Sequence, residues 1–155
     1  MPPTRIYADT SVYGGCFDPE FQAASRLFFD QVRQGRFRLV ASPLVEEEID
    51  GAPPRVVEHF RSLAAILEVI AVTPAARQLQ RAYLDAGIVS ERSAEDALHV
   101  ALATIHACPI LVSWNYKHIV HIEKGPRYNA VNMLRGLPAV AIAAPAEVVR
   151  YEEGL

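Results

Sequence analysis

Apolar residues recur along the chain with two different periods, and this pattern predicts strands that alternate with helices. Residues 5–8, RIYA, contain β-formers and run into Asp-Thr-Ser and then Gly-Gly, which predicts a strand followed by a loop. From Phe21 to Val32 the apolar residues lie at helical spacing, and Gly35 follows as a stop signal. Residues 37–41, FRLVA, predict a second strand.

Start and stop signals divide the rest of the chain into further elements. Ser42 followed by Pro43 has the form of an N-cap with proline at the first helical position, which predicts a helix through Ile49. Ser93 opens the most apolar helix, SAEDALHVALATIHA, with Asp96 at the third position of a capping-box pattern. The other predicted elements are helices at residues 53–67, 129–135 and 145–150, a helix opened by Thr73 and ended by Gly87, an extended piece at 67–72, and strands at 110–114 and 139–143.

Strands that alternate with helices in this way form βαβ units. The sequence therefore predicts an α/β fold with a mostly parallel central sheet that is covered on both faces. We see no internal repeat, linker or low-complexity stretch, so residues 1–155 are expected to form one domain. In open sheets of this kind the chemistry gathers at the C-terminal ends of the strands. Asp9 and Asn115 fall at such ends, and Glu48 and Asp96 lie on helices nearby.

Composition is that of an ordinary globular protein. The 155 residues are 51% hydrophobic and 21% charged, which is enough apolar material for a sizeable core. The net charge of −3 argues against a protein that coats nucleic acid through bulk positive charge. It leaves open an enzyme that touches RNA locally, because clustered carboxylates lower the net charge while a basic rim can still attract phosphates.

Cysteine usage and hydropathy both favour a cytoplasmic protein. Cys16 and Cys108 are too few for the disulfide framework of a small secreted protein, and we expect both to be reduced and structural. No apolar run approaches the roughly 18 residues that cross a bilayer. The first residues, MPPTRIYADT, lack the apolar segment of a signal peptide, so no contact with a membrane is expected.

Two aspartates stand at positions where a carboxylate could face a cleft. Asp9 follows a strand and precedes Ser11, which could hydrogen-bond to it, although an Asx-turn that leaves the strand explains Asp9 equally well. Asp96 has a structural explanation as the acidic member of a capping box favoured by the helix dipole. Residues 97–107 are apolar on nearly all sides, however, so this helix is expected to be central and its first turn to open onto the same cleft.

Glu48 is the third candidate carboxylate. It lies in a Glu-Glu-Glu run that would normally be a solvated helix face, but it follows Leu44 and Val45 by four and three positions and so shares their inward side. An inward carboxylate needs a partner, and a metal cation offsets its desolvation. Glu46 is expected to face solvent, whereas Glu47 stays an alternative to Glu48.

The other chemistry-bearing residues are interpreted as structural, with one exception. His99 and His106 lack the spacing of a zinc pair and are expected to be hydrogen-bonded structural residues. Ser11 lacks the GxSxG surroundings of a serine hydrolase nucleophile. The exception is a basic stretch after the strand at 110–114, which is placed to meet phosphates and comprises Lys117, His118, His121, Lys124 and Arg127.

Taken in order, these signals resemble the PIN-domain family. The resemblance rests on Asp-Thr-Ser after the first strand, Ser-Pro-Leu-Val followed by Glu48-Ile49, Asp96-Ala97 at the start of a buried helix, and Leu-Val-Ser-Trp-Asn after a later strand. The ending AVNMLRGLPAVAIAAPAEVV also looks like that of a bacterial PIN group of this length. The resemblance therefore covers nearly the whole chain.

The resemblance implies a three-layer α/β/α sandwich and a divalent-metal-dependent endoribonuclease that hydrolyses RNA phosphodiester bonds with Mg²⁺ or Mn²⁺. Many such proteins are the toxins of VapC-type, type II toxin-antitoxin pairs, so an antitoxin partner and a homodimer are expected. The matching positions are the metal-binding carboxylates Asp9, Glu48 and Asp96, with Asn115 at the fourth catalytic position, and the supporting residues Ser11 and Ser113. The basic stretch, and not the resemblance, makes Lys117 and His118 the expected RNA-contacting residues.

The fourth acidic site departs from the family pattern at two residues. In the family's Thr-x-Asp-x-Asp-Phe pattern Ser113 matches the threonine, but Asn115 stands for the first aspartate and Lys117 for the second. These two substitutions favour an alternative hypothesis, a PIN-fold module that binds RNA or a protein with little catalysis. An Asp-nucleophile phosphatase is disfavoured, because Asp9-Thr10-Ser11 lacks the second aspartate two residues on that would act as acid and base.

Overall fold

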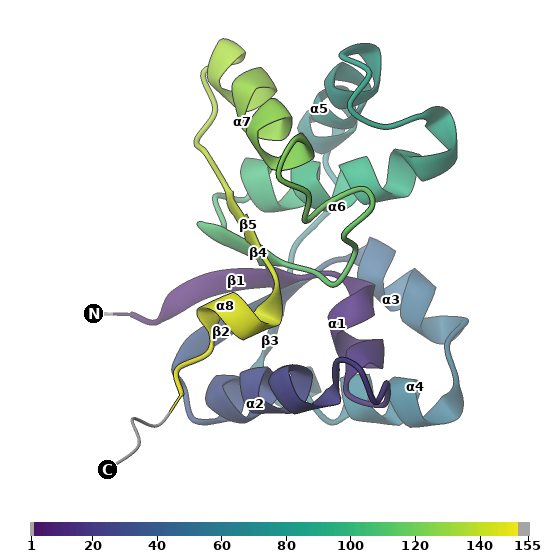
Figure 1. Ribbon diagram of the computed structural model, residues 1–155, viewed down its shortest axis with the longest axis vertical. Helices are drawn as coiled ribbons and strands as arrows, with labels where there is room; N and C mark the ends of the chain where they lie inside the picture. The colour runs from purple at the N-terminus through teal and green to yellow at the C-terminus, as the bar shows by residue number, and fades with distance from the viewer. Residues whose placement is uncertain (1, 152–155) are drawn as a thin grey trace.

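The computed structural model describes residues 2–151, and its centre is one sheet of five strands (Figure 1). The strand order is β3-β2-β1-β4-β5, and every neighbouring pair is parallel, which confirms the predicted sheet. The strands are β1 (Thr4–Ala8), β2 (Phe37–Ala41), β3 (Leu67–Val69), β4 (Ile110–Val112) and β5 (Ala141–Ala143).

The middle strand, β1, is the point at which the strand order reverses. From β1 the chain adds β2 and β3 on one side and later β4 and β5 on the other. The register pairs Tyr7 with Val40 of β2, and Ala8 with Val112 of β4. Residues that directly follow β1 and β4 therefore meet at the C-terminal edge, the place where open α/β sheets form ligand sites.

Helices cover both faces of this sheet, so the predicted three-layer α/β/α sandwich is confirmed (Figure 1). One layer contains α5 (Pro74–Asp85), α6 (Ala94–Ile105) and α7 (Lys124–Leu134). The other contains α1 (Thr10–Gly15), α2 (Gln22–Arg33), α3 (Pro43–Asp50), α4 (Pro54–Arg61) and the short α8 (Pro145–Val148). Two 3-10 turns, η1 (Ala64–Ile66) and η2 (Glu91–Ser93), precede β3 and α6.

The structure corrects the expectation of a loop directly after the first strand. Residues 10–15 form α1, in spite of the Gly-Gly pair that suggested a turn. Asp9 is the N-cap of this helix, and Val12 and Tyr13 are completely buried against the core. Capping and burial therefore outweigh the low helix propensity of the two glycines.

Several other boundaries differ from the prediction; the helix expected over residues 53–67, for example, ends as α4 at Arg61. α7 begins at Lys124 rather than at residue 129. In the sequence Pro126 resembles a helix break, but it lies in the first turn of α7, where proline is tolerated. Lys124 and Arg127 thus belong to a helix and not to a basic loop. At the start of α6, Ser93 is the N-cap residue but makes no side-chain cap hydrogen bond, so the predicted capping box is wrong.

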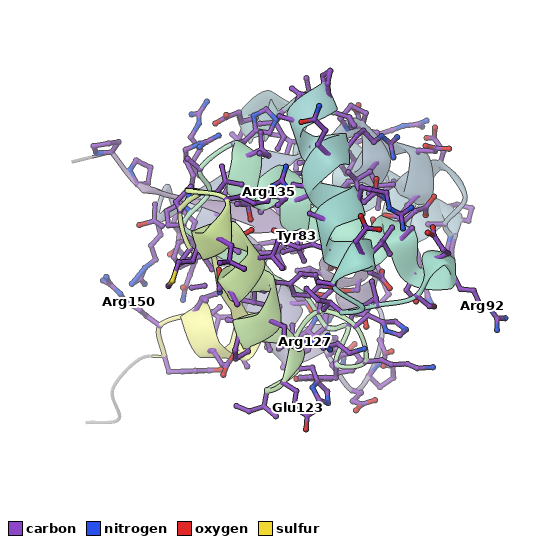
Figure 2. All side chains as sticks on the ribbon, turned by 90° about the horizontal axis from the view of Figure 1, so that it is seen from above. Tyr83, Arg92, Glu123, Arg127, Arg135 and Arg150 are labelled. Carbon is purple, nitrogen blue, oxygen red and sulfur yellow. The ribbon has the colours of Figure 1, made fainter. Side chains whose placement is uncertain are left out.

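α6 is the most buried helix, as its sequence predicts, and polar contacts fix it to its neighbours. Every residue from Ala97 to Thr104 is buried. Tyr83 of α5 lies between α5 and α7 (Figure 2), and its hydroxyl donates to Asn132 Oδ1 of α7 at 2.5 Å. Thr104 Oγ1 of α6 lies 3.4 Å from the same hydroxyl, so one small network joins all three helices of this layer.

Cys16 and Cys108 are free and buried, as expected for structural thiols. Burial raises the pKa of each thiol to about 11, so both are protonated at neutral pH. Within residues 2–151, none of the helices is long and apolar enough to span a bilayer.

Gly15, at the end of α1, allows the closest approach between α1 and the segment after β4. A Cβ atom on Gly15 would lie 2.5 Å from Ser25 Oγ and 2.7 Å from Trp114 Nε1. Those two atoms are themselves hydrogen-bonded, with Trp114 Nε1 donating to Ser25 Oγ at 2.8 Å. A side chain at position 15 would therefore break a bond that fixes Trp114.

We predict that Gly15→Ala lowers the free energy of unfolding by about 1–3 kcal/mol, the usual cost of overpacking. The matched control is Gly14→Ala, because a Cβ there has nothing within 4 Å and should be neutral or stabilising by up to about 1 kcal/mol. Urea unfolding followed by circular dichroism measures both. Equal stability of the two variants would contradict the close packing at Gly15.

Candidate functional site

Asp9 lies at the switch point of the sheet, directly after β1, and is only 4% exposed. Its Oδ1 atom accepts hydrogen bonds from the Ser11 backbone N–H at 3.2 Å and from Ser11 Oγ at 2.6 Å. Its Oδ2 atom accepts from Ser113 Oγ at 2.6 Å. Because Ser113 follows β4, the two strands that meet at the switch point hold one carboxylate between them. The predicted supporting residues Ser11 and Ser113 therefore both contact Asp9.

Burial dominates the electrostatics of Asp9. Desolvation raises the pKa of its carboxyl, and the nearby Glu48 carboxylate raises it further. The charge of His99 and the hydrogen bonds from Ser11 and Ser113 act in the opposite direction, but the net pKa stays above the usual aspartate value. The groups around Asp9 therefore do not fully offset the cost of burying its ionised form.

Glu48 turns inward from α3, as the helical phase predicts. Glu46 and Glu47 are exposed, whereas the Glu48 side chain is 30% exposed. Its Oε1 atom accepts from Thr10 Oγ1 at 2.8 Å and from His99 Nε2 at 2.6 Å. The alternative phase, with Glu47 facing inward, is therefore excluded.

The hydrogen bonds to Glu48 keep it ionised. Partial burial raises the pKa of this carboxyl, but the hydrogen bond and the charge of His99, together with the Thr10 hydroxyl, lower it by more. The resulting pKa lies below the usual glutamate value. The pKa values of the two carboxyls therefore shift in opposite directions: burial raises that of Asp9, and interactions with His99 and Thr10 lower that of Glu48.

A buried hydrogen-bonded chain runs from the core to Glu48 and was not identified from the sequence. The Tyr7 hydroxyl lies 2.8 Å from Ser42 Oγ and 2.7 Å from His99 Nδ1. His99 Nε2 carries the proton that it donates to Glu48, because a carboxylate can only accept. Ser42 also accepts from the Val45 N–H as the N-cap of α3, so the same chain fixes the helix that carries Glu48.

The expectation that His99 and His106 are hydrogen-bonded residues is confirmed, and His99 is bonded to a candidate-site carboxylate. His106 Nε2 contacts the Ala71 carbonyl oxygen at 2.7 Å, away from the carboxylates. His99 is 2% exposed and contacts Glu48 directly. One sequence signal could have found it: His99 lies three positions after Asp96 on the same helix, where the two side chains share a face.

Asp96 lies in the first turn of α6 and is half-buried. Its charge acts on the loop after β4 and on α7, since it raises the pKa of both His118 and Tyr128. Within residues 2–151, no group of three or more acidic, histidine or cysteine side chains is gathered closely enough to hold a metal ion. The structure thus brings Asp9 and Glu48 together, and the part of Asp96 in a metal site stays a prediction.

Asn115 and its neighbours form a tight turn after β4. Asn115 Oδ1 accepts from the His118 N–H at 2.9 Å, and the Asn115 N–H donates to Ser113 Oγ at 2.9 Å. Lys117 is exposed at this turn, and the partly buried His118 side chain lies beside Lys124, with 3.3 Å between Nδ1 and Nζ. Desolvation and the charges of Lys124 and Lys117 lower the pKa of His118, although Asp96 opposes them.

Asp9 and Glu48 offer carboxylate oxygens as possible ligands for a hydrated Mg²⁺ or Mn²⁺ ion. Both ions prefer oxygen ligands, and Mg²⁺ commonly keeps several waters while one or two carboxylates hold it. All three hydrogen bonds to Asp9 come from neutral donors. Within the described chain, Glu48 Oε2 takes part in none of the hydrogen bonds, so this oxygen stays available to a ligand.

The fold and the placement of Asp9 define the class of protein: the chain has the PIN-domain fold. The solved structure of the PIN domain endonuclease Utp24 is similar with a TM-score of 0.50 and 14% identity, over 93% of this chain and 87% of that one. FitAB bound to an IR36 DNA fragment contains a chain that is similar with a TM-score of 0.60 and 14% identity, over 96% of this chain and 99% of that one.

A third similar structure is VapBC2 from Rickettsia felis bound to a DNA fragment from their promoter. Its matching chain has a TM-score of 0.56 and 13% identity, over 90% of this chain and 97% of that one. No protein-family model and no curated protein matches the sequence. At these identities the likeness establishes the fold, which confirms the expected PIN-like architecture.

We predict that Asp9→Asn stabilises the metal-free protein at neutral pH by on the order of 1 kcal/mol. The raised folded-state pKa means that ionised Asp9 costs stability above that pKa, and the cost disappears as the pH falls below the unfolded value near 3.9. The gain should therefore be largest at neutral pH and shrink on acidification. Urea unfolding in EDTA at two pH values measures it.

Glu47→Gln is the control, because Glu47 is an exposed carboxylate on α3 and its loss should change stability little. Destabilisation of the Asp9→Asn variant by the same amount at both pH values would show that the hydrogen bonds to Ser11 and Ser113 outweigh the cost of burying the charge.

Proposed function

We propose that the protein is a divalent-metal-dependent endoribonuclease that hydrolyses RNA phosphodiester bonds. The observation that carries this proposal is the buried Asp9 carboxylate, which two serines hold at the switch point of a PIN fold beside Glu48. A buried acid with a raised pKa beside a second carboxylate is typical of functional sites. Its ionised form would gain most from a cation, and a bound cation would also attract a phosphodiester.

Each residue of the site has a defined task in this proposal. Asp9 and Glu48 would hold the ion, with Asp96 as a further acidic ligand on the other helix layer. When bound, Mg²⁺ or Mn²⁺ supplies an activated water and neutralises charge on the leaving oxygen. Ser11 and Ser113 fix both oxygens of Asp9, and His99 and Thr10 orient Glu48 through Oε1. The carboxylates are thus oriented before substrate arrives, which reduces the reorganisation needed for the reaction.

The loop after β4 would contact the RNA backbone. Lys117 is exposed, and His118 and Lys124 lie together beside it. Positive side chains next to a carboxylate site attract phosphates locally even though the whole chain has a net charge of −3. Lys117 and His118 are therefore the proposed substrate-binding residues.

A role as the toxin of a type II toxin-antitoxin pair follows as part of the same proposal. Two of the similar structures, VapBC2 and FitAB, were solved bound to DNA fragments, the first from their own promoter. We propose an antitoxin partner and a homodimer for this chain by analogy of fold. A small upstream reading frame with a DNA-binding start and an apolar tail supports the role, and an isolated gene contradicts it.

A catalytically weak binding module is the second candidate, and the turn at Asn115 favours it. The amide oxygen that would face a metal is already the acceptor for the His118 N–H. Asn115 also brings no negative charge, so metal affinity rests more heavily on Asp9 and Glu48. Binding of RNA without metal-dependent cleavage would support this candidate.

We predict that the purified protein cleaves RNA with Mg²⁺ or Mn²⁺ and stops when EDTA is added. Glu48→Gln and Asp9→Asn should each lower the cleavage rate by at least about a hundredfold, because each removes a charge from the ion's ligands while keeping the shape of the side chain. Glu46→Gln is the matched control on the exposed side of α3 and should cleave normally. Cleavage that persists in EDTA, or in Asp9→Asn, would falsify the assignment.

We predict that Asn115→Asp tightens Mg²⁺ binding by about fivefold or more, because a carboxylate adds roughly 1 kcal/mol of attraction near the ion. The turn should survive, since an aspartate oxygen can still accept from the His118 N–H. Calorimetry measures the affinity, and the Mg²⁺ concentration for half-maximal cleavage should fall in parallel. Unchanged affinity would mean that residue 115 does not face the carboxylates.

A further inference from the structure

One oxygen of the Glu48 carboxylate is fully used by hydrogen bonds, and the other is free. A carboxylate oxygen accepts about two hydrogen bonds, one at each lone pair. Thr10 Oγ1 and His99 Nε2 donate to Glu48 Oε1 at 2.8 and 2.6 Å, whereas Oε2 takes part in none of the hydrogen bonds of residues 2–151. Glu48 therefore presents a single oxygen to a ligand and not both.

The Asp9 carboxylate is restricted in the same way by its two serines. Ser11 Oγ accepts from the Trp114 N–H at 2.9 Å. Ser113 Oγ likewise accepts from the Asn115 N–H at 2.9 Å. Each hydroxyl has one proton, which it donates to Asp9. Together with the Ser11 N–H, these donors take three of the roughly four acceptor positions of the carboxylate, and the position that is left lies on Oδ2.

The hydrogen bonds behind Glu48 have a fixed direction. His99 Nε2 carries the proton that it donates to Glu48, so Nδ1 of the neutral imidazole is an acceptor. The Tyr7 hydroxyl donates its one proton to Nδ1 at 2.7 Å and accepts from Ser42 Oγ at 2.8 Å. Both His99 and Tyr7 are buried. His99 therefore cannot turn away from Oε1 without leaving a buried polar group unpaired, which is costly.

Divalent cations differ in what they require from carboxylates. Mg²⁺ needs octahedral geometry, keeps several waters and is commonly held by one or two carboxylates. Ca²⁺ takes about 6–8 oxygen ligands and often binds a carboxylate through both of its oxygens. Asp9 and Glu48 meet the first requirement with one free oxygen each. The second requirement would force Thr10 or His99 to release Glu48 Oε1.

We propose that His99 and Thr10 make this site select Mg²⁺ or Mn²⁺ over Ca²⁺, because they leave Glu48 a single oxygen for the ion. This inference rests on the proposed function for the presence of a cation, and it adds which residues decide the choice of cation. His99 and Thr10 act through Glu48 and are positioning residues. Tyr7 acts one step further back, because its hydroxyl fixes His99.

Calorimetric titration of the metal-free protein with Mg²⁺ and with Ca²⁺, without RNA, tests the proposal. The unaltered protein should bind Mg²⁺ more tightly. Thr10→Val keeps the shape of the side chain but frees one position on Oε1, so the ratio of Ca²⁺ affinity to Mg²⁺ affinity should rise by about tenfold, as is usual for residues behind a metal ligand. His99→Leu should raise this ratio similarly. His99→Gln should restore it, because an amide N–H can donate to Oε1.

His106→Leu is the matched control. His106 is the other hydrogen-bonded histidine of this helix, the C-cap of α6, and it contacts the Ala71 carbonyl oxygen away from the carboxylates. Its loss should leave the affinity ratio unchanged. General destabilisation does not alter the ratio in any variant, because loss of folded protein weakens the binding of both ions equally.

Three results would overturn the proposal. These are absence of binding of either ion by the unaltered protein, Ca²⁺ binding as tight as Mg²⁺ binding, and an unchanged ratio in Thr10→Val or in His99→Leu. RNA cleavage is measured separately with Mg²⁺. A ratio that responds to these variants without cleavage supports the inference and contradicts the nuclease. Cleavage that stops in EDTA, with a ratio that does not respond, supports the nuclease and contradicts the inference.

Discussion

The hydrogen bonds that hold the buried Asp9 carboxylate are the constraint on which the site depends. Burying an isolated carboxylate costs several kcal/mol, and hydrogen bonds to a charged group return roughly 1.5–3 kcal/mol each. Asp9 accepts three such bonds, from Ser11 and Ser113, yet its pKa stays raised, so desolvation exceeds the compensation. Residues that follow β1 and β4 supply these donors together, because those strands are neighbours in the sheet. The strand order therefore determines which carboxylate is buried.

Glu48 depends on a different part of the fold. Its orientation comes from His99 of α6 and Thr10 of α1, so the two helix layers meet at one carboxylate oxygen. Behind His99, the Tyr7 hydroxyl and Ser42 extend the chain of hydrogen bonds into the core, where loss of one partner would leave others buried and unpaired. This coupling explains why a histidine can be both 2% exposed and part of the site. A shift of α6 would therefore change the orientation of the Glu48 side chain even if α3 stayed in place.

Local signals in the sequence predict some of these features and cannot predict others. The inward phase of Glu48 follows from its spacing to Leu44 and Val45, and the position of Asp9 follows from the strand before it, so both could be inferred. The contact of His99 with Glu48 joins residues 51 positions apart, and only the tertiary fold creates it. α1 was missed because its glycines resemble a turn, while its stability comes from burial of Val12 and Tyr13, which local propensity does not contain.

The segment after β4 combines three tasks in a few residues, and this limits how it can vary. Ser113 donates to Asp9, Trp114 donates to Ser11 and to Ser25, and Asn115 closes the turn through His118. Each bond uses a different group, so every residue of the segment makes its own contact and none can replace another. Asn115 illustrates the consequence: its oxygen accepts a backbone N–H that an aspartate could also satisfy, so the turn alone does not require the amide. Asparagine and aspartate at position 115 differ in their charge near Asp9. An aspartate there would add to the repulsion that the Glu48 carboxylate already exerts on Asp9.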